Sequence, residues 1–132
     1  MSHHIPVSVE TSHDPLSRMR VFQLACELIP DSFEDARALQ ADPVTAEIAG
    51  QLYAAVGSIE AHISEGYSRS SGKDRAKVFE YALGSVRESM SWYRASLPIL
   101  GELKVKDRRD RLEEMRRMLL AIIPRERGKS MK

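Results

Sequence analysis

The chain has 132 residues, a formal net charge of +1 and a single cysteine, Cys26. This length fits one domain that can bury its own core without a disulfide or a metal ion. No apolar run approaches the ~20 residues that a membrane span requires, and residues 1–11 lack the apolar block of a signal peptide. The composition therefore predicts a cytoplasmic protein with no membrane partner, in which Cys26 is a buried core residue rather than a reactive thiol.

The two halves of the chain carry opposite charge. Residues 1–65 contain three basic and ten acidic residues, whereas residues 66–132 contain seventeen basic and nine acidic residues. This polarity could pair one copy of the chain with another, or present a basic face to nucleic acid. It could equally reflect two solvated faces of different composition, and the sequence leaves these explanations open.

The first helix is predicted to follow a flexible N-terminus of residues 1–13. It begins near Asp14-Pro15, an N-cap followed by the residue favoured at the first helical position. Pro30 is expected to end or kink this helix and to leave residues 31–41 as a looser connection. The apolar arc is wider than one neighbouring helix needs; it consists of Met19, Phe22, Cys26, Ile29 and Phe33, with Val21, Leu24, Ala25 and Leu28 beside them.

The second helix is predicted to start at Asp42-Pro43 and to end at Gly66, placed as a C-terminal capping glycine. A third helix follows a capping pair, Ser71 with Asp74, and ends before Gly101. The apolar positions of these two helices repeat at three and four residues; they are Ile48, Leu52, Ala55, Ile59 and His62, then Phe79, Ala82, Val86, Ser89, Tyr93 and Leu97.

The fourth helix is predicted to run from near Lys106-Asp107 to Pro124, with a basic C-terminal tail over residues 125–132. Its apolar positions are Leu112, Met115, Leu119 and Ile122. Four amphipathic helices joined by short links predict an all-α, antiparallel up-down four-helix bundle over residues 14–124.

The hairpin formed by the second and third helices carries the most distinctive residues. Gly57 and Gly84 fall at matching heights, which suggests a close approach of the two backbones that offsets the cost of glycine in a helix. Glu65 opposes the helix dipole unless it reaches a basic partner, so it is interpreted as a latch. The residues assigned to this structural motif are Gly57, Ser58, Ile59, His62, Glu65, Gly66, Gly84, Ser85 and Glu88.

Residues 58–67, with Arg69, Lys73 and residues 82–88, resemble the bacterial four-helix-bundle proteins often called intervening-sequence proteins. Some of these are encoded inside insertions in large-subunit ribosomal RNA genes. The pattern is Ser-Ile, then Asn-Ile, then Glu-Gly at the end of one helix, and Gly-Ser followed by Glu in the next. This chain departs from the pattern at His62, which replaces the usual Asn, and at Tyr53-Ala54, which replaces a basic pair.

The resemblance implies a ring-forming homo-oligomer, typically a pentamer, of poorly defined biological role. The chain is also similar to the accessory proteins of diversity-generating retroelements, which act with a reverse transcriptase and nucleic acid. A ring with head-to-tail contacts could join an acidic patch to a basic one. The first functional hypothesis is therefore a non-enzymatic, self-assembling scaffold or adaptor.

The alternative hypothesis is binding of structured RNA or another nucleic acid through the basic second half. It requires the basic residues to converge on one exposed face. The candidate contacts are Arg69, Lys73, Arg75, Lys77, Lys106, Arg108, Arg109, Arg111, Arg116 and Arg117.

An enzyme or metalloprotein is the third possibility. His62 and Glu65 stand in the wrong order for the Glu-x-x-His motif of di-iron bundles, and the sequence shows no nucleophile elbow or phosphate-binding loop. No catalytic residue, metal site or cofactor is predicted.

Overall fold

The computed structural model describes residues 14–128, and this part of the chain is helical with no strand. The predicted flexible N-terminus and residues 129–132 of the predicted tail lie outside the described residues. The elements are η2 (Pro15–Arg18), α1 (Arg20–Gln40), α2 (Ala46–Tyr67), α3 (Gly72–Ala95), α4 (Leu97–Leu100) and α5 (Glu102–Arg127).

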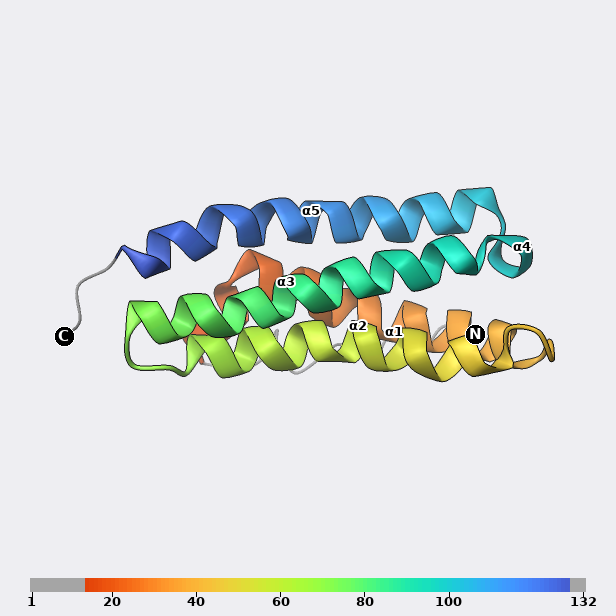
Figure 1. Cartoon of the computed structure of the whole chain (residues 1–132), viewed down its shortest axis with the longest axis horizontal. Coiled ribbons are helices and arrows are strands. Elements are labelled where there is room, and N and C mark those ends of the chain that lie inside the picture. The colour runs from red at the N-terminus through yellow and green to blue at the C-terminus, as the bar shows by residue number, and fades with distance from the viewer. Residues whose placement is uncertain (1–13, 129–132) are drawn as a thin grey trace.

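The four long helices lie side by side, with connections at alternating ends (Figure 1). α2 packs along α1 and α3, and α3 packs along α5, whereas α1 and α5 touch over a much smaller surface. The predicted all-α helical bundle is therefore confirmed, with its closest packing in the order α1, α2, α3, α5.

The core consists mainly of the apolar positions predicted from the helical spacing. The largest side chains that are less than 2% exposed are Tyr93, Phe79, Leu28, Leu39, Leu52, Ile59, Ile63, Leu112, Met115, Leu119, Val21 and Val56. Two predicted core positions are wrong, because Phe33 is 46% exposed and Leu97 is 41% exposed. Most of the apolar arc of the first helix is buried within the chain, and Met19 and Ile29 are partly buried, so the arc provides little surplus beyond Phe33.

Pro30 does not end the first helix, contrary to the prediction. α1 continues through Pro30 to Gln40, since a proline removes one backbone donor but leaves the following residues free to remain helical. The Ser32 hydroxyl donates to the Ile29 carbonyl over 2.8 Å within this turn. The predicted start at Asp14 holds for η2 alone, whose Leu16 amide donates to the Asp14 side chain, and extended Met19 separates η2 from α1.

Gly66 is not a C-terminal cap, because α2 continues through it to Tyr67. A Cβ atom at Gly66 would lie 2.7 Å from Cδ1 of Phe79, so this glycine allows α3 to approach α2 closely. The close approach predicted at Gly57 and Gly84 is wrong, because a Cβ at either position would meet nothing within 4 Å. The hairpin glycine that packing requires is therefore Gly66, near the turn.

The capping interaction at the start of α3 is confirmed: the Asp74 amide donates to Ser71 Oγ over 3.1 Å. The corner that follows differs from the prediction, since α3 stops at Ala95 and the short α4 contains Pro98. Gly101 then reverses the chain with a φ of 86°, a conformation that favours glycine.

α5 is longer than predicted at both ends. It begins at Glu102, and Pro124 does not end it, because residues 125–127, predicted as the start of the basic tail, belong to the helix. Arg75 and Glu80 of α3 hold this last turn through ion pairs with Glu126 and Arg127, each 2.6 Å long. Pairing to α3 thus extends the helix past the proline.

Candidate interaction surfaces

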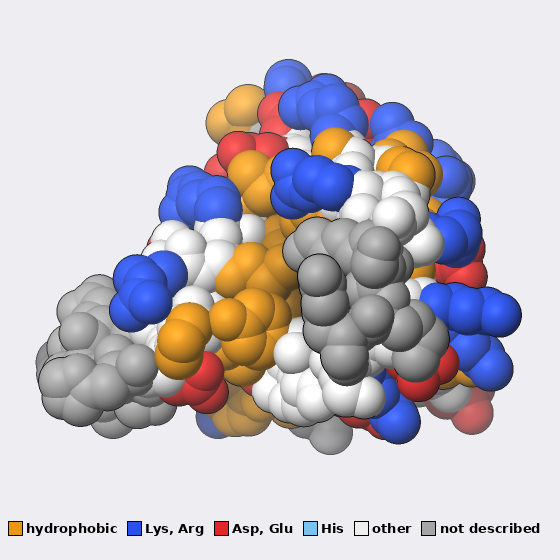
Figure 2. Space-filling view, turned by 90° about the vertical axis from the view of Figure 1, so that its left-hand side faces the viewer, with side chains coloured by type: hydrophobic (Ala, Val, Ile, Leu, Met, Phe, Trp, Pro, Cys, Tyr) orange, Lys and Arg blue, Asp and Glu red, His pale blue; other side chains and the backbone are white. Residues whose placement is uncertain are grey.

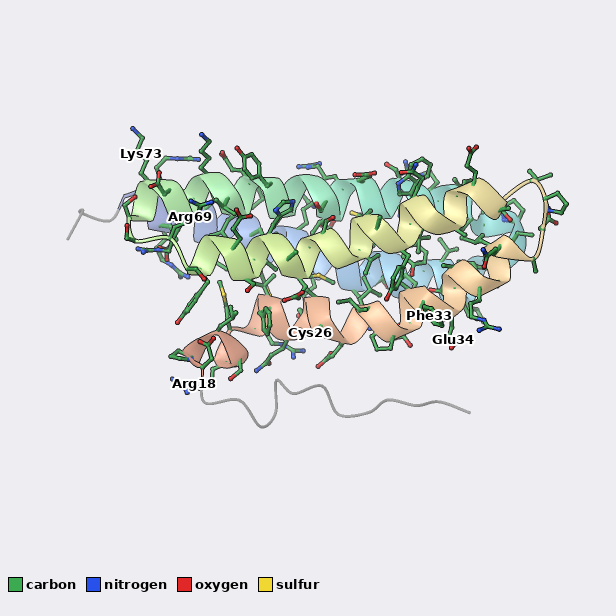
Figure 3. All side chains as sticks on the ribbon, turned by 90° about the horizontal axis from the view of Figure 1, so that it is seen from below. Arg18, Cys26, Phe33, Glu34, Arg69 and Lys73 are labelled. Atoms are coloured by element: carbon green, nitrogen blue, oxygen red, sulfur yellow. The ribbon has the colours of Figure 1, made fainter. Side chains whose placement is uncertain are left out.

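The predicted nucleic-acid contacts do not converge on one face. Arg69, Lys73, Arg75 and Lys77 lie near the turn between α2 and α3, where Lys73 points away from the bundle (Figure 3). Lys106, Arg108 and Arg111 lie at the start of α5, near the opposite end of the bundle. α3 is roughly 35 Å long at 1.5 Å per residue, and much of that length lies between the two groups. The other predicted contacts, Arg109, Arg116 and Arg117, also lie on α5.

A buried polar network uses part of the second group. Asp35 of α1 is 1% exposed and accepts hydrogen bonds from the Tyr93 hydroxyl over 2.7 Å and from Arg108 Nε over 2.8 Å. A second contact joins Arg108 Nη2 to the other carboxylate oxygen over 3.2 Å, so the guanidinium grips Asp35 with two nitrogens. Burial, the hydrogen bond to Asp35 and its negative charge raise the pKa of Tyr93 well above its ordinary value.

A second ion pair beside this network joins the same helices. Arg111 Nη1 lies 2.8 Å from Asp31 and 3.3 Å from Asp107, while Arg108 Nη1 lies 2.6 Å from Asp107. Arg108 and Arg111 are therefore internal links between α5 and α1 rather than free phosphate contacts. Some of the opposite charges of the two halves therefore neutralise each other through ion pairs within the chain.

Sequence reasoning missed Asp35 and its partners because it ended the first helix at Pro30. Once the helix continues, Leu28, Ser32, Asp35 and Leu39 fall at a 4-3-4 spacing, and all are at most 1% exposed. That spacing was the available signal for a carboxylate aimed into the core.

The basic residues at the hairpin turn are also partly engaged. Arg69 donates to Glu65 over 2.8 Å, so Glu65 has the basic partner that the latch interpretation requires. Arg75 pairs with Glu126 and donates through Nη1 to the Arg69 carbonyl over 3.0 Å. Arg75 is therefore a structural link between α3, α5 and the turn. Arg69, Lys73 and Lys77 are exposed, and of these Arg69 is paired with Glu65.

The outer face of α2 is lined by small residues. They recur at a 4-3-4-3 spacing and leave the helix backbone nearly bare; they are Gly50, Ala54, Gly57, Ala61 and Ser64. A Cβ at Gly50 or Gly57 would meet nothing within 4 Å. We call these five residues the small-residue face of α2.

Aromatic pairs flank this face on both sides. The rings of Phe33 and Tyr53 meet edge to face with centroids 5.7 Å apart, and Figure 3 shows Phe33 on α1 beside α2. On the α3 side, the rings of His62 and Tyr81 meet in the same manner at 5.8 Å. Tyr53 is 40% exposed and Tyr81 50% exposed, so both pairs border solvent.

His62 lies at this border rather than in the core as predicted. Its side chain is 33% exposed, and its Nδ1 lies 3.6 Å from Glu65, beyond hydrogen-bonding distance. The other motif residues have local roles: Ile59 is fully buried, Ser58 Oγ donates to the Ala54 carbonyl, Glu88 accepts from the Trp92 indole, and the Ser85 carbonyl accepts from Ser89. Within residues 14–128, no three His, Cys, Asp or Glu side chains are placed to hold a metal ion.

Cys26 is 7% exposed, as predicted for a core position. Burial, with the charges of Glu60 and Glu27, raises the pKa of its thiol from 9.0 to about 11. An acid whose folded pKa is raised holds its proton longer in the folded state, so unfolding becomes easier as pH rises through 9 towards 11.

The reactivity of Cys26 should show this shift. At pH 8 the thiolate fraction in the folded protein is expected to be about 100-fold below that of the unfolded chain. We therefore expect a thiol reagent to modify the native protein at least that much more slowly than the protein in denaturant. Equal rates in the two conditions would show that Cys26 is accessible and titrates normally.

Hydrophobic side chains gather near the middle of the end view in Figure 2, with some also at the top. Lys and Arg side chains lie along the top, the right and the left edge of this view. None of the described helices has the length and apolar character needed to cross a bilayer.

Comparison with known proteins places this architecture in a family. Residues 17–121 match the family described as 23S rRNA-intervening sequence protein. No curated protein and no solved structure matches the chain. The match spans α1 to most of α5 and includes the hairpin motif, and the chain therefore belongs to the 23S rRNA-intervening sequence protein family.

Proposed function

We propose that this protein is a non-enzymatic scaffold or adaptor that assembles with copies of itself through the small-residue face of α2. The observation that supports this is the conjunction of bare helix backbone and exposed aromatic rings on one surface. The proposal assigns no catalytic step and no cofactor to the chain.

Glycine in the middle of a helix costs about 1 kcal/mol relative to alanine. Gly50 and Gly57 incur this cost, yet the open space around them shows no packing within the chain that requires glycine. A helix from a second copy could approach such a bare face closely, because interaxial distances depend on the side chains at the contact.

The flanking rings supply what a small-residue face lacks, which is apolar area. Aromatic residues are enriched at the centres of protein interfaces because they bury much surface with few rotatable bonds. Tyr53 and Phe33 on one side and Tyr81 on the other would enclose the incoming helix. This arrangement favours a helical partner over a flat surface.

We further propose that the copies assemble into a closed ring. In a cyclic ring of odd number the contacting patches differ, so the small-residue face of one copy meets another surface of the next. The family resemblance favours five copies, and the cytoplasm is the compartment that the composition favours.

The test is the mass of the particle in solution. Light scattering after size exclusion is expected to give about five times the chain mass of 14.9 kDa. The double variant Gly57→Arg with Ala61→Arg is expected to give the mass of one chain with unchanged helical circular dichroism, because arginine is a better helix former than glycine.

The matched control is Ser91→Arg, which adds a charge to the exposed face of α3 away from α2. This variant should retain the mass of the assembly. A wild-type protein that elutes as a single chain at every concentration would refute the proposal, as would a Gly57→Arg, Ala61→Arg variant of unchanged mass.

A further inference from the structure

Arginines from α3 and α5 line the outer side of the seam between these helices. Arg87 and Arg94 stand seven residues apart on α3, and Arg109 and Arg116 stand seven residues apart on α5, with Arg117 beside them. Seven residues are two helical turns, or roughly 10 Å, so each pair shares one side of its helix. We call these five residues the arginine face.

We propose that the arginine face binds the phosphate backbone of structured, base-paired nucleic acid. The inference goes beyond the scaffold role and does not depend on it. It also changes the surface predicted from the sequence, since Arg87 and Arg94 enter the site while Arg108 and Arg111 leave it.

Glu113 shows that the two helices bring these arginines together. Arg116 grips its carboxylate through Nε over 2.8 Å and Nη2 over 2.6 Å, and Arg117 Nη1 lies 3.6 Å away. The hydrogen bond from Arg116 holds the pKa of Glu113 below its usual range, with further help from the charges of Arg116, Arg117 and Arg87. Arg87 therefore acts on α5 from across the seam.

Most of the arginine face has capacity left for a ligand. Among residues 14–128, Arg87 and Arg94 are exposed and form no hydrogen bond or ion pair through their side chains. Arg109 also forms no ion pair within this range, although its Nε is buried. Five guanidinium groups against the carboxylates of Glu113 and Glu114 leave a local charge of five minus two, or +3. Asp110, a further acid on this stretch of α5, is paired with Lys106 over 2.6 Å.

The chemistry of the face favours phosphate over other anions. Guanidinium groups bind phosphate oxygens with two parallel hydrogen bonds. The arginines of each pair are about 10 Å apart along their helix, and such a regular spacing can follow a regular phosphate backbone. Protein partners usually require an apolar anchor at the centre of the contact. The centre of the arginine face is instead charged, which favours a polyanion as the ligand.

The face is suited to base-paired rather than single-stranded nucleic acid. Single strands are held by stacking their bases on aromatic rings. The exposed rings among the described residues lie on α1, α2 and the α2 side of α3; they are Phe33, Tyr53, Tyr67 and Tyr81. Recognition through the backbone alone implies weak dependence on sequence and strong dependence on salt.

The experiment measures binding of a fluorescently labelled 20-base-pair RNA duplex by anisotropy at 50 and 200 mM salt. Wild-type protein is compared with Arg87→Glu, Arg94→Glu, two positions free of ion pairs among the described residues. The matched control is Lys73→Glu, Lys77→Glu, the same charge change on exposed positions of the same helix. Circular dichroism establishes that both variants keep their helices.

We expect the arginine variant to bind at least ~10-fold more weakly than the control and to lose about two from the slope of log affinity against log salt. Equal losses in both variants, or no binding of the duplex by wild-type protein at 50 mM salt, would overturn the inference. Displacement of the RNA by polyglutamate at matched charge would also overturn the inference, because the arginine face would then be a site for acidic proteins. The particle mass of each sample is measured in parallel. A loss of RNA binding at unchanged mass is then distinguished from a loss that follows from failure to assemble.

Discussion

Replacing Asp35 with alanine is expected to lower the free energy of unfolding by about 3–5 kcal/mol. The substitution leaves Arg108, whose side chain is 13% exposed, without its buried carboxylate and removes the acceptor of the Tyr93 hydroxyl. Arg108 keeps its contact of 2.6 Å with Asp107, but two of its nitrogens and the Tyr93 hydroxyl lose their buried acceptor, and breaking one side of a buried pair is far more costly than the intact pair is favourable. Urea denaturation followed by circular dichroism measures the loss.

Asp110→Ala provides the control, since Asp110 pairs with Lys106 at the surface of α5. It should change the unfolding free energy much less than Asp35→Ala, because exposed ion pairs contribute little. The double variant Asp35→Leu, Arg108→Met removes both charges and should recover much of the stability. Equal effects of Asp35→Ala and Asp110→Ala would mean that the network is not buried in solution.

Replacing Gly66 with alanine is the second large effect that we expect, a destabilisation of about 1–3 kcal/mol by overpacking. The new Cβ would lie 2.7 Å and 2.8 Å from two ring carbons of Phe79 and 3.3 Å from Cβ of Val78. Because Phe79 is 1% exposed, its ring has little room to move away. The midpoint of thermal or urea unfolding reports the change.

Gly84→Ala is the matched substitution, because a Cβ there meets nothing within 4 Å. It should be neutral or should stabilise the protein by up to about 1 kcal/mol through helix propensity. Combining Gly66→Ala with Phe79→Leu should restore part of the loss by shortening the side chain that collides. A Gly66→Ala protein more stable than wild type would show that α2 and α3 separate more easily than the packing indicates.

Basic residues in this protein fall into two groups with different consequences. Arg75, Arg108 and Arg111 hold helices together through partly buried ion pairs. Reversing their charge would therefore damage the fold, and a loss of binding in such variants would say nothing about contact. Arg87 and Arg94 form no ion pair within residues 14–128, so their charge, like that of Lys73 and Lys77, can be changed with the fold preserved.

The sequence by itself determined the four-helix architecture and most of the core. Spacings of three and four residues identified the buried faces of α2, α3 and α5, and local chemistry identified the Ser71 cap. These features depend on residues within one or two turns of each other, so periodicity and capping rules are sufficient to find them.

Only the tertiary structure decided how far the helices extend and which partner each charged residue takes. α1 continues past Pro30, and α5 past Pro124, where neighbouring helices pack and pair with them. Gly66 was identified as a packing glycine only when Phe79 was seen against it. Such contacts join residues distant in sequence, and they depend on the register between helices, which the spacing within a single helix does not specify.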